Sequence, residues 1–313
     1  DKALKLRVEL LLRSVKVGNP LQQWRSLYYI YKNVTYLEEQ QCHFVRRKKA
    51  NIYYEIIGTG IPIIMLHGFS PDHRLMKGCM EPVFKEREGW KRIYLDLPGM
   101  GKTTDYSSIQ NSDEMLEAIT ELIHTIIPQE SYLLVGESYG GYLARGIMRK
   151  SVDQLLGTAF ICPLIIPEKE QRTVPPHCIV QADTAFLSTL SQQEQDDFMS
   201  HQVVLDAYNW ERYSTEVLAG CNLADQAFLE KIQQSYGFSF AVEEKSFDKP
   251  SLFLLGKQDS VVGYKDAFSI LEKFPRATFA ILDSAGHNLQ IEQPELFTEL
   301  MNEWLNRVEG EMN

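Results

Sequence analysis

The sequence has few cysteines and no metal-type histidine spacing, and these absences exclude several classes of protein. Its 313 residues include five cysteines, an odd number, which are widely spaced and form no CxxC pair. This pattern predicts reduced thiols rather than a disulfide framework. No HExxH spacing occurs among the seven histidines, so we expect no metal site. The cysteines are Cys42, Cys79, Cys162, Cys178 and Cys221.

Basic residues are also too few for a nucleic-acid-binding protein. Lys and Arg number 32 against 42 Asp and Glu, a net charge of -10, which repels phosphate backbones and predicts no nucleic-acid partner. No apolar run approaches the roughly 20 residues that span a bilayer. Charged residues recur throughout residues 1–17, unlike a secretory signal. We therefore expect a cytoplasmic protein without stable membrane insertion.

From residue 41 onward, strand-like and helix-like segments alternate. A hairpin is expected over 42–58, and short apolar runs that end in Gly, Pro or Asp predict further strands. Helical periodicity separates these runs, and alternation of this kind predicts an α/β fold, a mostly parallel sheet with helices on both faces. Strands are expected within 61–68, 91–99, 131–136, 156–164, 251–259 and 277–283, and helices within 111–127, 139–150, 263–274 and 294–308. Ser112 is the expected N-cap of the first of these helices.

Two stretches interrupt the alternation. Residues 164–248 lack strand signals and contain helical segments, and an insertion this long between strands predicts a separate subdomain, which we interpret as a helical lid. Residues 1–40 precede the first strand and carry a helical apolar stripe from Leu4 to Val15. The expected domains are thus a helical N-terminal extension (1–40), an α/β core (41–163 and 249–313) and the lid (164–248).

The N-terminal extension differs from the body in charge. Seven basic and two acidic residues lie within 1–37, so this segment is positive while the remainder is strongly negative. We expect it to pack on the body or to form a homodimer contact. A membrane-surface or transit role is the alternative.

The stretch VGESYGG (135–141) surrounds one serine with glycines between an expected strand and an expected helix. A loop serine is the ordinary interpretation of a GxSxG match. A tight strand-to-helix turn is also the setting in which a nucleophilic serine is raised above the sheet edge, and glycines relieve its steric strain. Ser138 is therefore the candidate nucleophile.

A nucleophilic serine needs a base and an acceptor that orients the base. His287 follows the expected strand 277–283, and Asp259 follows the strand at 251–256, so both lie at strand ends where α/β sheets bind ligands. The chain order Ser138, Asp259, His287 is the one typical of this turn. Asp283 is the competing acid, but it lies only four residues before His287 in the same loop.

The oxyanion formed on acyl transfer requires backbone N–H donors. We expect them from Tyr139, directly after the nucleophile, and from Phe69 in the HGFS loop, with His67 holding that loop. GMGKTT (99–104) resembles a phosphate loop, but Asp96 stands where the first glycine is required, and no dinucleotide fingerprint is present. No cofactor is expected.

Together HGFS, DLPGMGKT, GESYGG, GKQD and AGHNLQIEQP, in this order, resemble the α/β-hydrolase superfamily over residues 41–313. The resemblance implies an eight-stranded sheet, a helical lid after the sixth strand, a triad of Ser138, Asp259 and His287, and oxyanion donors Phe69 and Tyr139. A serine at 138 is unlike the epoxide hydrolase and haloalkane dehalogenase branches, which carry Asp there.

The resemblance implies a cofactor-free serine hydrolase acting on a small ester or related acyl substrate. A proline iminopeptidase-like aminopeptidase is the alternative enzyme, since GESYGG is similar to the serine turn of that branch. The fold also hosts ligand-binding proteins without activity, which is the alternative of a different class.

Overall fold

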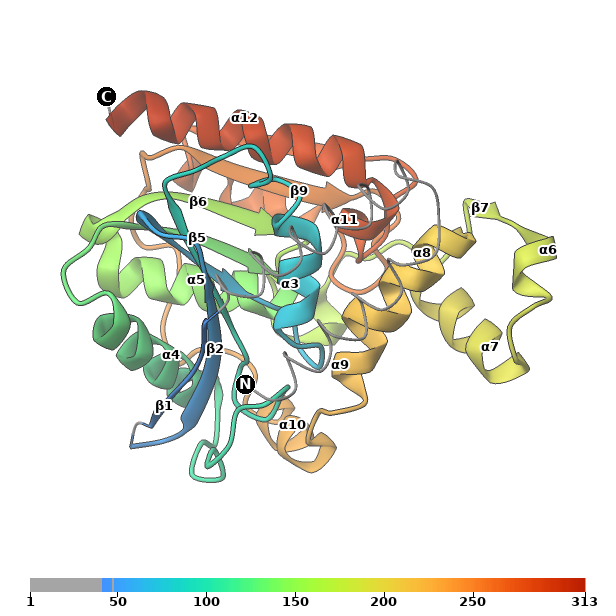
Figure 1. Cartoon of the computed structure of the whole chain (residues 1–313), viewed down its shortest axis with the longest axis horizontal. Coiled ribbons are helices and arrows are strands. Elements are labelled where there is room, and N and C mark those ends of the chain that lie inside the picture. Colours follow the sequence, from blue (N-terminus) through green and yellow to red (C-terminus); the bar gives the residue numbers. More distant parts are fainter. Residues whose placement is uncertain (1–40, 47, 313) are drawn as a thin grey trace, which may run out of the picture.

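The computed structural model describes residues 41–46 and 48–312 (Figure 1). The helical extension expected over 1–40, with its homodimer contact, lies outside the described residues. Within the described part of the chain, no helix combines the length and apolar character needed to cross a bilayer.

One eight-stranded sheet organises the described chain, as the sequence predicts. Its strand order is β1-β2-β4-β3-β5-β6-β9-β10. β2 runs antiparallel to both of its neighbours, β1 and β4, and every other neighbouring pair in this sheet is parallel. β1 and β2 form the expected hairpin. The strands are β1 (Gln41–Arg46), β2 (Asn51–Ile57), β3 (Ile61–Leu66), β4 (Trp90–Leu95), β5 (Tyr132–Glu137), β6 (Leu155–Ile161), β9 (Ser251–Gly256) and β10 (Ala277–Leu282).

Helices cover both faces of the sheet (Figure 1). On one face α5 (Ser138–Ser151) packs on β5 and contacts α4 (Ser112–Ile126). On the other, α12 (Pro294–Met312) packs on β6 and β9 and contacts α3 (His73–Met80). The indole of Trp304, fully buried on α12, donates to the carbonyl of Pro250 at 3.0 Å. Because helices cover both faces of the sheet, β5 is buried on both sides, which explains its continuous apolar run from Tyr132 to Val135.

Two local expectations need correction. Ser112 was the expected N-cap of α4, but the side chain of Asn111 accepts from the Glu114 N–H, and Ser112 is the first helical residue. The helix expected within 263–274 is a 3₁₀ segment, η4 (Asp266–Lys273), with a backbone hydrogen bond from Phe268 to Lys265. Asn and Ser are similar as caps, and periodicity does not distinguish these two helix types over two turns.

The chain between β6 and β9 is mainly helical, but it also contains a two-stranded parallel sheet that the sequence did not predict. Its strands have two residues each, too few for an alternation pattern to reveal. The elements of this insertion are η2 (Lys169–Gln171), β7 (Gln181–Ala182), α6 (Thr184–Leu187), α7 (Gln192–His201), β8 (Val204–Leu205), α8 (Ala207–Arg212), the π-helical η3 (Tyr213–Leu218), α9 (Ala219–Cys221) and α10 (Gln226–Gln233).

Candidate active site

Ser138 lies at the tight turn between β5 and α5, with a left-handed φ of +50°. The surrounding backbone leaves no room for side chains on the neighbouring glycines. A Cβ on Gly136 would lie 2.4 Å from the carbonyl oxygen of Gly140, and one on Gly140 would lie 2.3 Å from that of Leu66. The GxSxG spacing is therefore a steric requirement of the turn, which holds the serine in a strained conformation.

The structure brings the three side chains expected at the site into one hydrogen-bonded chain. His287 Nε2 lies 2.9 Å from Ser138 Oγ, and its Nδ1 lies 2.9 Å from Asp259 Oδ2. The other carboxylate oxygen of Asp259 accepts the backbone N–H groups of Val261 and Val262 at 2.8 and 3.0 Å. With Nδ1–H donated to Asp259, the lone pair of Nε2 faces the serine hydroxyl.

Burial and charge act in opposite directions on this pair. Burial raises the pKa of Asp259, but the charge of His287 and the hydrogen bonds to the carboxylate outweigh it and hold that pKa below its ordinary value. Burial lowers the pKa of His287, yet the carboxylates of Asp259 and Glu137 outweigh it and raise the pKa to about 9. The histidine is accordingly a strong base.

Asp283 does not approach the histidine ring. Its carboxylate is exposed and accepts from the Gln258 side chain at 2.9 Å, with Lys257 Nζ at 3.8 Å. The structure thus places Asp259, and not Asp283, beside His287.

Phe69 and Tyr139, the two expected oxyanion donors, lie on adjacent segments. Among the described residues the Phe69 N–H has no hydrogen-bond partner. Tyr139 is the second residue of α5, where helix geometry leaves N–H groups without intrahelical acceptors. Their side chains also pack together, with the rings edge-to-face at 5.1 Å. Both N–H groups are available to a developing negative charge.

His67 supports this loop from beneath. Its Nδ1 lies 2.7 Å from the carbonyl of Gly68, and its Nε2 accepts the Leu97 N–H at 2.9 Å. Both ring nitrogens are therefore engaged with backbone, which agrees with the expectation that His67 holds the loop.

Two buried glutamates near the histidine were missed by the sequence analysis. Glu137, next to Ser138, places Oε1 at 3.4 Å from His287 Nε2. Glu292 accepts the N–H groups of Gly286 and Val203 at 2.5 and 2.8 Å, which ties the histidine loop to the insertion. Burial raises the pKa of each to about 7. The motifs GESYGG and AGHNLQIEQP contain both residues, but no spacing rule marked them.

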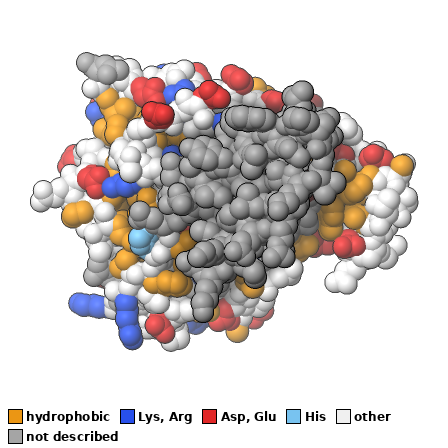
Figure 2. Space-filling view, in the orientation of Figure 1, with side chains coloured by type: hydrophobic (Ala, Val, Ile, Leu, Met, Phe, Trp, Pro, Cys, Tyr) orange, Lys and Arg blue, Asp and Glu red, His pale blue; other side chains and the backbone are white. Residues whose placement is uncertain are grey.

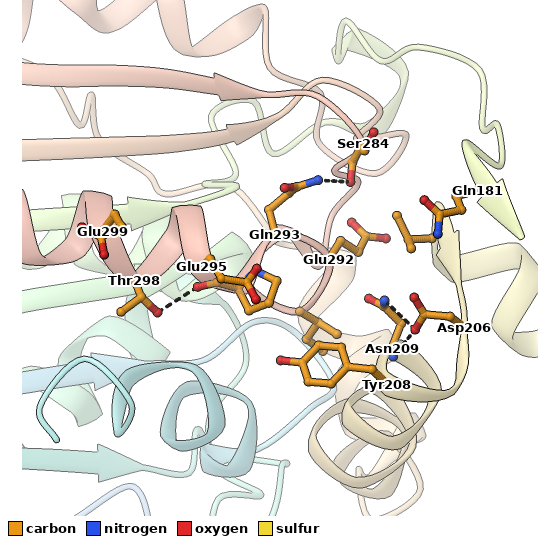
Figure 3. A pocket seen from close by; sticks show the side chains of 13 residues that line it. Gln181, Asp206, Tyr208, Asn209, Ser284, Glu292, Gln293, Glu295, Thr298 and Glu299 are labelled. Carbon is orange, nitrogen blue, oxygen red and sulfur yellow. Dashed lines mark hydrogen bonds between the residues drawn. The ribbon is translucent and has the colours of Figure 1, made fainter. Parts of the chain in front are cut away.

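Glu292 also borders a pocket of about 620 Å³ on the outer side of the histidine loop (Figure 3). Figure 3 shows Gln293 and Ser284 on one side of it and Asp206, Asn209 and Tyr208 of the insertion on the other. None of the triad residues lines this pocket, which lies between α12 and α8. It is a junction between the core and the insertion rather than the site of the serine.

Aromatic residues of the insertion pack on α5, the helix that begins at Ser138. The ring of Tyr236 stacks on that of Tyr139 at 4.7 Å and meets Phe69 edge-on at 5.1 Å. Phe238 stacks on Tyr142 at 4.2 Å. These contacts place an apolar wall beside Phe69 and Tyr139, the two expected oxyanion donors.

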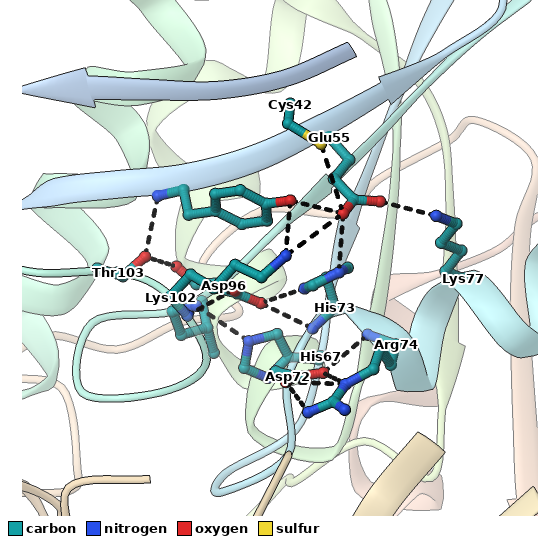
Figure 4. A network of polar contacts seen from close by, with 12 residues as sticks. Cys42, Glu55, His67, Asp72, His73, Arg74, Lys77, Asp96, Lys102 and Thr103 are labelled. Carbon is teal, nitrogen blue, oxygen red and sulfur yellow. Dashed lines mark hydrogen bonds and ion pairs between the residues drawn. The ribbon is translucent and has the colours of Figure 1, made fainter. Parts of the chain in front are cut away.

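A buried cluster of charges surrounds His73, close to His67 (Figure 4). His73 Nδ1 is 2.7 Å from Asp96 Oδ1, and Nε2 is 3.1 Å from Glu55 Oε1. Lys77 and the Tyr53 hydroxyl also donate to Glu55, at 2.8 and 2.6 Å. Asp96 in turn accepts the Lys102 N–H at 2.8 Å and so anchors the turn at 96–102 that contacts His67 through Leu97.

Asp72, His73 and Asp96 have the composition of a metal site, since their ligand atoms lie within 4.8 Å of one another. Burial lowers the pKa of His73, but Asp96 and Glu55 outweigh it and raise the pKa to about 9. A protonated imidazole offers no lone pair to a metal. The raised pKa favours an imidazolium held between the carboxylates of Glu55 and Asp96.

Comparison with known proteins agrees with the fold described above. A family model described as the alpha/beta hydrolase fold matches residues 61–294. The crystal structure of an α/β superfamily hydrolase from Oenococcus oeni is 31% identical, with a TM-score of 0.78, over 85% of this chain and 99% of its own.

More distant similarities include a lipase and a protein related to proline iminopeptidase. Monoacylglycerol lipase ABHD6 of Bos taurus is 22% identical over 87% of this chain and 84% of its own length. The proline iminopeptidase-related protein TTHA1809 of Thermus thermophilus is 19% identical, with a TM-score of 0.63, over 86% of this chain and 98% of its own. At this identity the latter likeness concerns the fold alone.

The His73 cluster generates a prediction about stability and pH. The folded-state pKa of His73, about 9, exceeds the ordinary value of 6.5, so its stabilising effect is complete below pH 6.5 and is lost as the pH rises through 9. We expect His73→Gln to remove this loss. Urea unfolding at pH 6 and pH 9 measures it: the wild type should lose more stability across the interval than the variant. His124→Gln, at an exposed histidine of α4, is the control, and equal losses in all three proteins would contradict the prediction.

Proposed function

The chain belongs to the α/β-hydrolase fold family, and we propose that it is a serine hydrolase that cleaves a small ester or related acyl substrate. The observation that carries this proposal is the continuous hydrogen-bonded chain from Ser138 through His287 to Asp259. A nucleophile, a base and an orienting acid in contact are the parts that acyl transfer requires.

In the proposed reaction, Ser138 Oγ attacks the acyl carbon while His287 Nε2 takes the hydroxyl proton. Asp259 keeps Nδ1 protonated and stabilises the imidazolium. Collapse of the tetrahedral intermediate breaks the acyl–oxygen bond, and His287 gives its proton to the departing alkoxide. A water then attacks the acyl group on Ser138 by the same route, which releases the carboxylic acid and restores the serine.

The backbone N–H groups of Phe69 and Tyr139 serve as the proposed oxyanion hole. Both belong to segments whose geometry is set before substrate binds, because His67 holds the first and the strained serine turn holds the second. Preorganised donors of this kind stabilise the transition state without reorganisation, typically by about 3–4 kcal/mol for each donor.

The insertion at 164–248 is proposed to act as a lid over this site. Tyr236 and Phe238 contact the nucleophile helix, and Phe69 completes the apolar wall. An apolar surface beside the oxyanion donors favours the acyl chain of an ester and excludes water from the charged intermediate.

An ester is preferred over a peptide amine because the insertion supplies no free buried carboxylate for a substrate ammonium. Glu194 closes the capping box of α7 with Ser191, Asp197 accepts from Tyr213 and Glu216 pairs with Arg212. The remaining candidates, Asp196, Glu211 and Glu230, are exposed. An ammonium in a dry pocket requires a carboxylate partner. The similarity to a monoacylglycerol lipase also supports an ester.

Replacing Ser138 with Ala should abolish activity, because the nucleophile is removed while the glycines of the turn stay in place. We expect kcat for an aryl ester to fall by about 10⁶, and labelling by a fluorophosphonate probe to disappear. Ser284→Ala, at a serine in the histidine loop, is the control and should retain labelling. Persistent labelling of Ser138→Ala would show that another residue is acylated, and an unlabelled wild type would favour a ligand-binding protein without turnover.

Replacing Asp259 with Asn should lower kcat by about 10⁴, because the amide favours the wrong tautomer of His287. The matched control is Asp283→Asn, which removes the same charge from an exposed position near the same histidine. Circular dichroism and kcat on one aryl ester distinguish the two variants. A loss of activity in the control alone would transfer the orienting role to Asp283.

The substrate class is tested by comparing kcat/KM for nitrophenyl acetate and butyrate with that for prolyl and alanyl arylamides. The apolar wall, and an insertion without a free buried carboxylate, predict that the esters are preferred. An arylamide preference of tenfold or more, about 1.4 kcal/mol in transition-state binding, would instead support the aminopeptidase alternative.

A further inference from the structure

Glu137 is a buried acid at the reacting nitrogen of the site. Its side chain is 3% exposed, and Oε1 lies 3.4 Å from His287 Nε2, on the serine side of the ring. Asp259 occupies the opposite side, at Nδ1. The imidazole therefore has one carboxylate at each nitrogen, whereas orienting the ring requires only Asp259.

The fold makes a specific space for this carboxylate. Glu137 is the last residue of β5 and occupies the N-cap position of α5, but its side chain caps no helical N–H. A Cβ on Gly68 would lie only 2.1 Å from Glu137 Oε2, so the glycine before Phe69 leaves room for the acid beneath the oxyanion loop. Among the described residues no Lys or Arg forms an ion pair with Glu137, and His287 is its cationic partner.

An unpaired carboxylate in a buried site is unfavourable unless a positive charge approaches it. When His287 is neutral, the form that can accept the serine proton, Nε2 carries a lone pair, but in the tetrahedral intermediate it carries the proton taken from Ser138. Beyond the backbone hydrogen bond from Gly68, Glu137 thus gains a charged partner only when the imidazolium forms. An interaction that strengthens as the reaction proceeds lowers the barrier rather than merely binding substrate.

We propose that Glu137 is a positioning residue that holds the catalytic proton on Nε2 of His287 and sets the pH range in which the triad works. This inference rests on the proposed serine hydrolase function and assigns a role in it to a fourth side chain, that of Glu137. The Glu137 carboxylate raises the pKa of His287. This makes the neutral histidine a stronger base, but it also increases the fraction of free enzyme in which the histidine is protonated and inactive.

Several charged and titratable groups surround His287. Asp259, Glu137 and Arg172 each affect its pKa, and the buried Glu292 behind the loop responds to its charge. The thiol of Cys162, which contacts the Gly286 carbonyl at 3.5 Å, has its pKa raised by burial and stays neutral. Of these groups, Glu137 is the carboxylate that lies beside Nε2. Its removal should therefore change the pH profile of activity in a way that the other groups do not.

The test is the pH profile of kcat/KM for an aryl ester with Glu137→Gln, which preserves shape and removes charge. We expect the acidic limb of the profile to move to lower pH by about one unit, because one of the two carboxylates that raise the pKa of His287 is gone. At high pH, where the histidine is neutral in both proteins, the variant should be slower by up to about tenfold, because the imidazolium has lost a partner. The two profiles should therefore cross.

Asp283→Asn is the control for removal of a nearby but exposed carboxylate, and its acidic limb should stay in place. Glu137→Asp keeps the charge but withdraws it by one methylene, so an intermediate shift is expected, and this variant also serves if Gln impairs folding. Unchanged limbs in both Glu137 variants would overturn the proposal. An unshifted limb with a raised KM for arylamides would assign Glu137 to substrate ammonium binding instead.

A second readout does not require activity. NMR titration of the His287 ring in a Ser138→Ala background should show a lower pKa when Glu137→Gln is added. The two proposals can therefore fail separately. An unlabelled, inactive wild type would contradict the proposed function, whereas an unshifted His287 pKa would contradict only the role of Glu137.

Discussion

The buried hydrogen bond between His287 Nδ1 and Asp259 is the interaction on which the site depends. It joins the loop after β9 to the loop after β10, two strands at the end of the sheet order. Asp259 is fully buried, so its charge is tolerable only because the imidazole and two backbone N–H groups satisfy it. The bond aims the opposite nitrogen at Ser138, which directly follows β5, a strand nearer the middle of the sheet.

The serine turn is the steric counterpart of this electrostatic constraint. Gly136 and Gly140 let β5, α5 and the end of β3 approach closely enough to raise Ser138 at the sheet edge. The same close approach brings Tyr139 next to Phe69, so that one turn positions both the proposed nucleophile and one proposed oxyanion donor. Its strained φ persists because the packing of β5 between β3 and β6 leaves no alternative.

The carboxylates around His287 have separate structural roles. Asp259 orients the ring, Glu292 connects the histidine loop to Val203 of the insertion, and Glu137 fills the space beneath the oxyanion loop. Farther back, His73 lies between Glu55 and Asp96 and holds the turn that supports His67. His73 and His287 thus each lie between two buried carboxylates.

The sequence by itself determined the parallel sheet, the insertion and the residues of the candidate triad, because hydrophobic periodicity and the GxSxG turn are local properties of the chain. It indicated Asp259 over Asp283 from position alone, and the structure places Asp259 at the ring. Only the tertiary structure revealed Glu137 and Glu292 as neighbours of His287, and the short strands β7 and β8. These carboxylates were missed because, in the sequence, a carboxylate beside a glycine turn is indistinguishable from an ordinary exposed polar residue. Its burial and its distance from a histidine 150 positions away are decided only when β5 and the loop after β10 are brought together by the strands that lie between them.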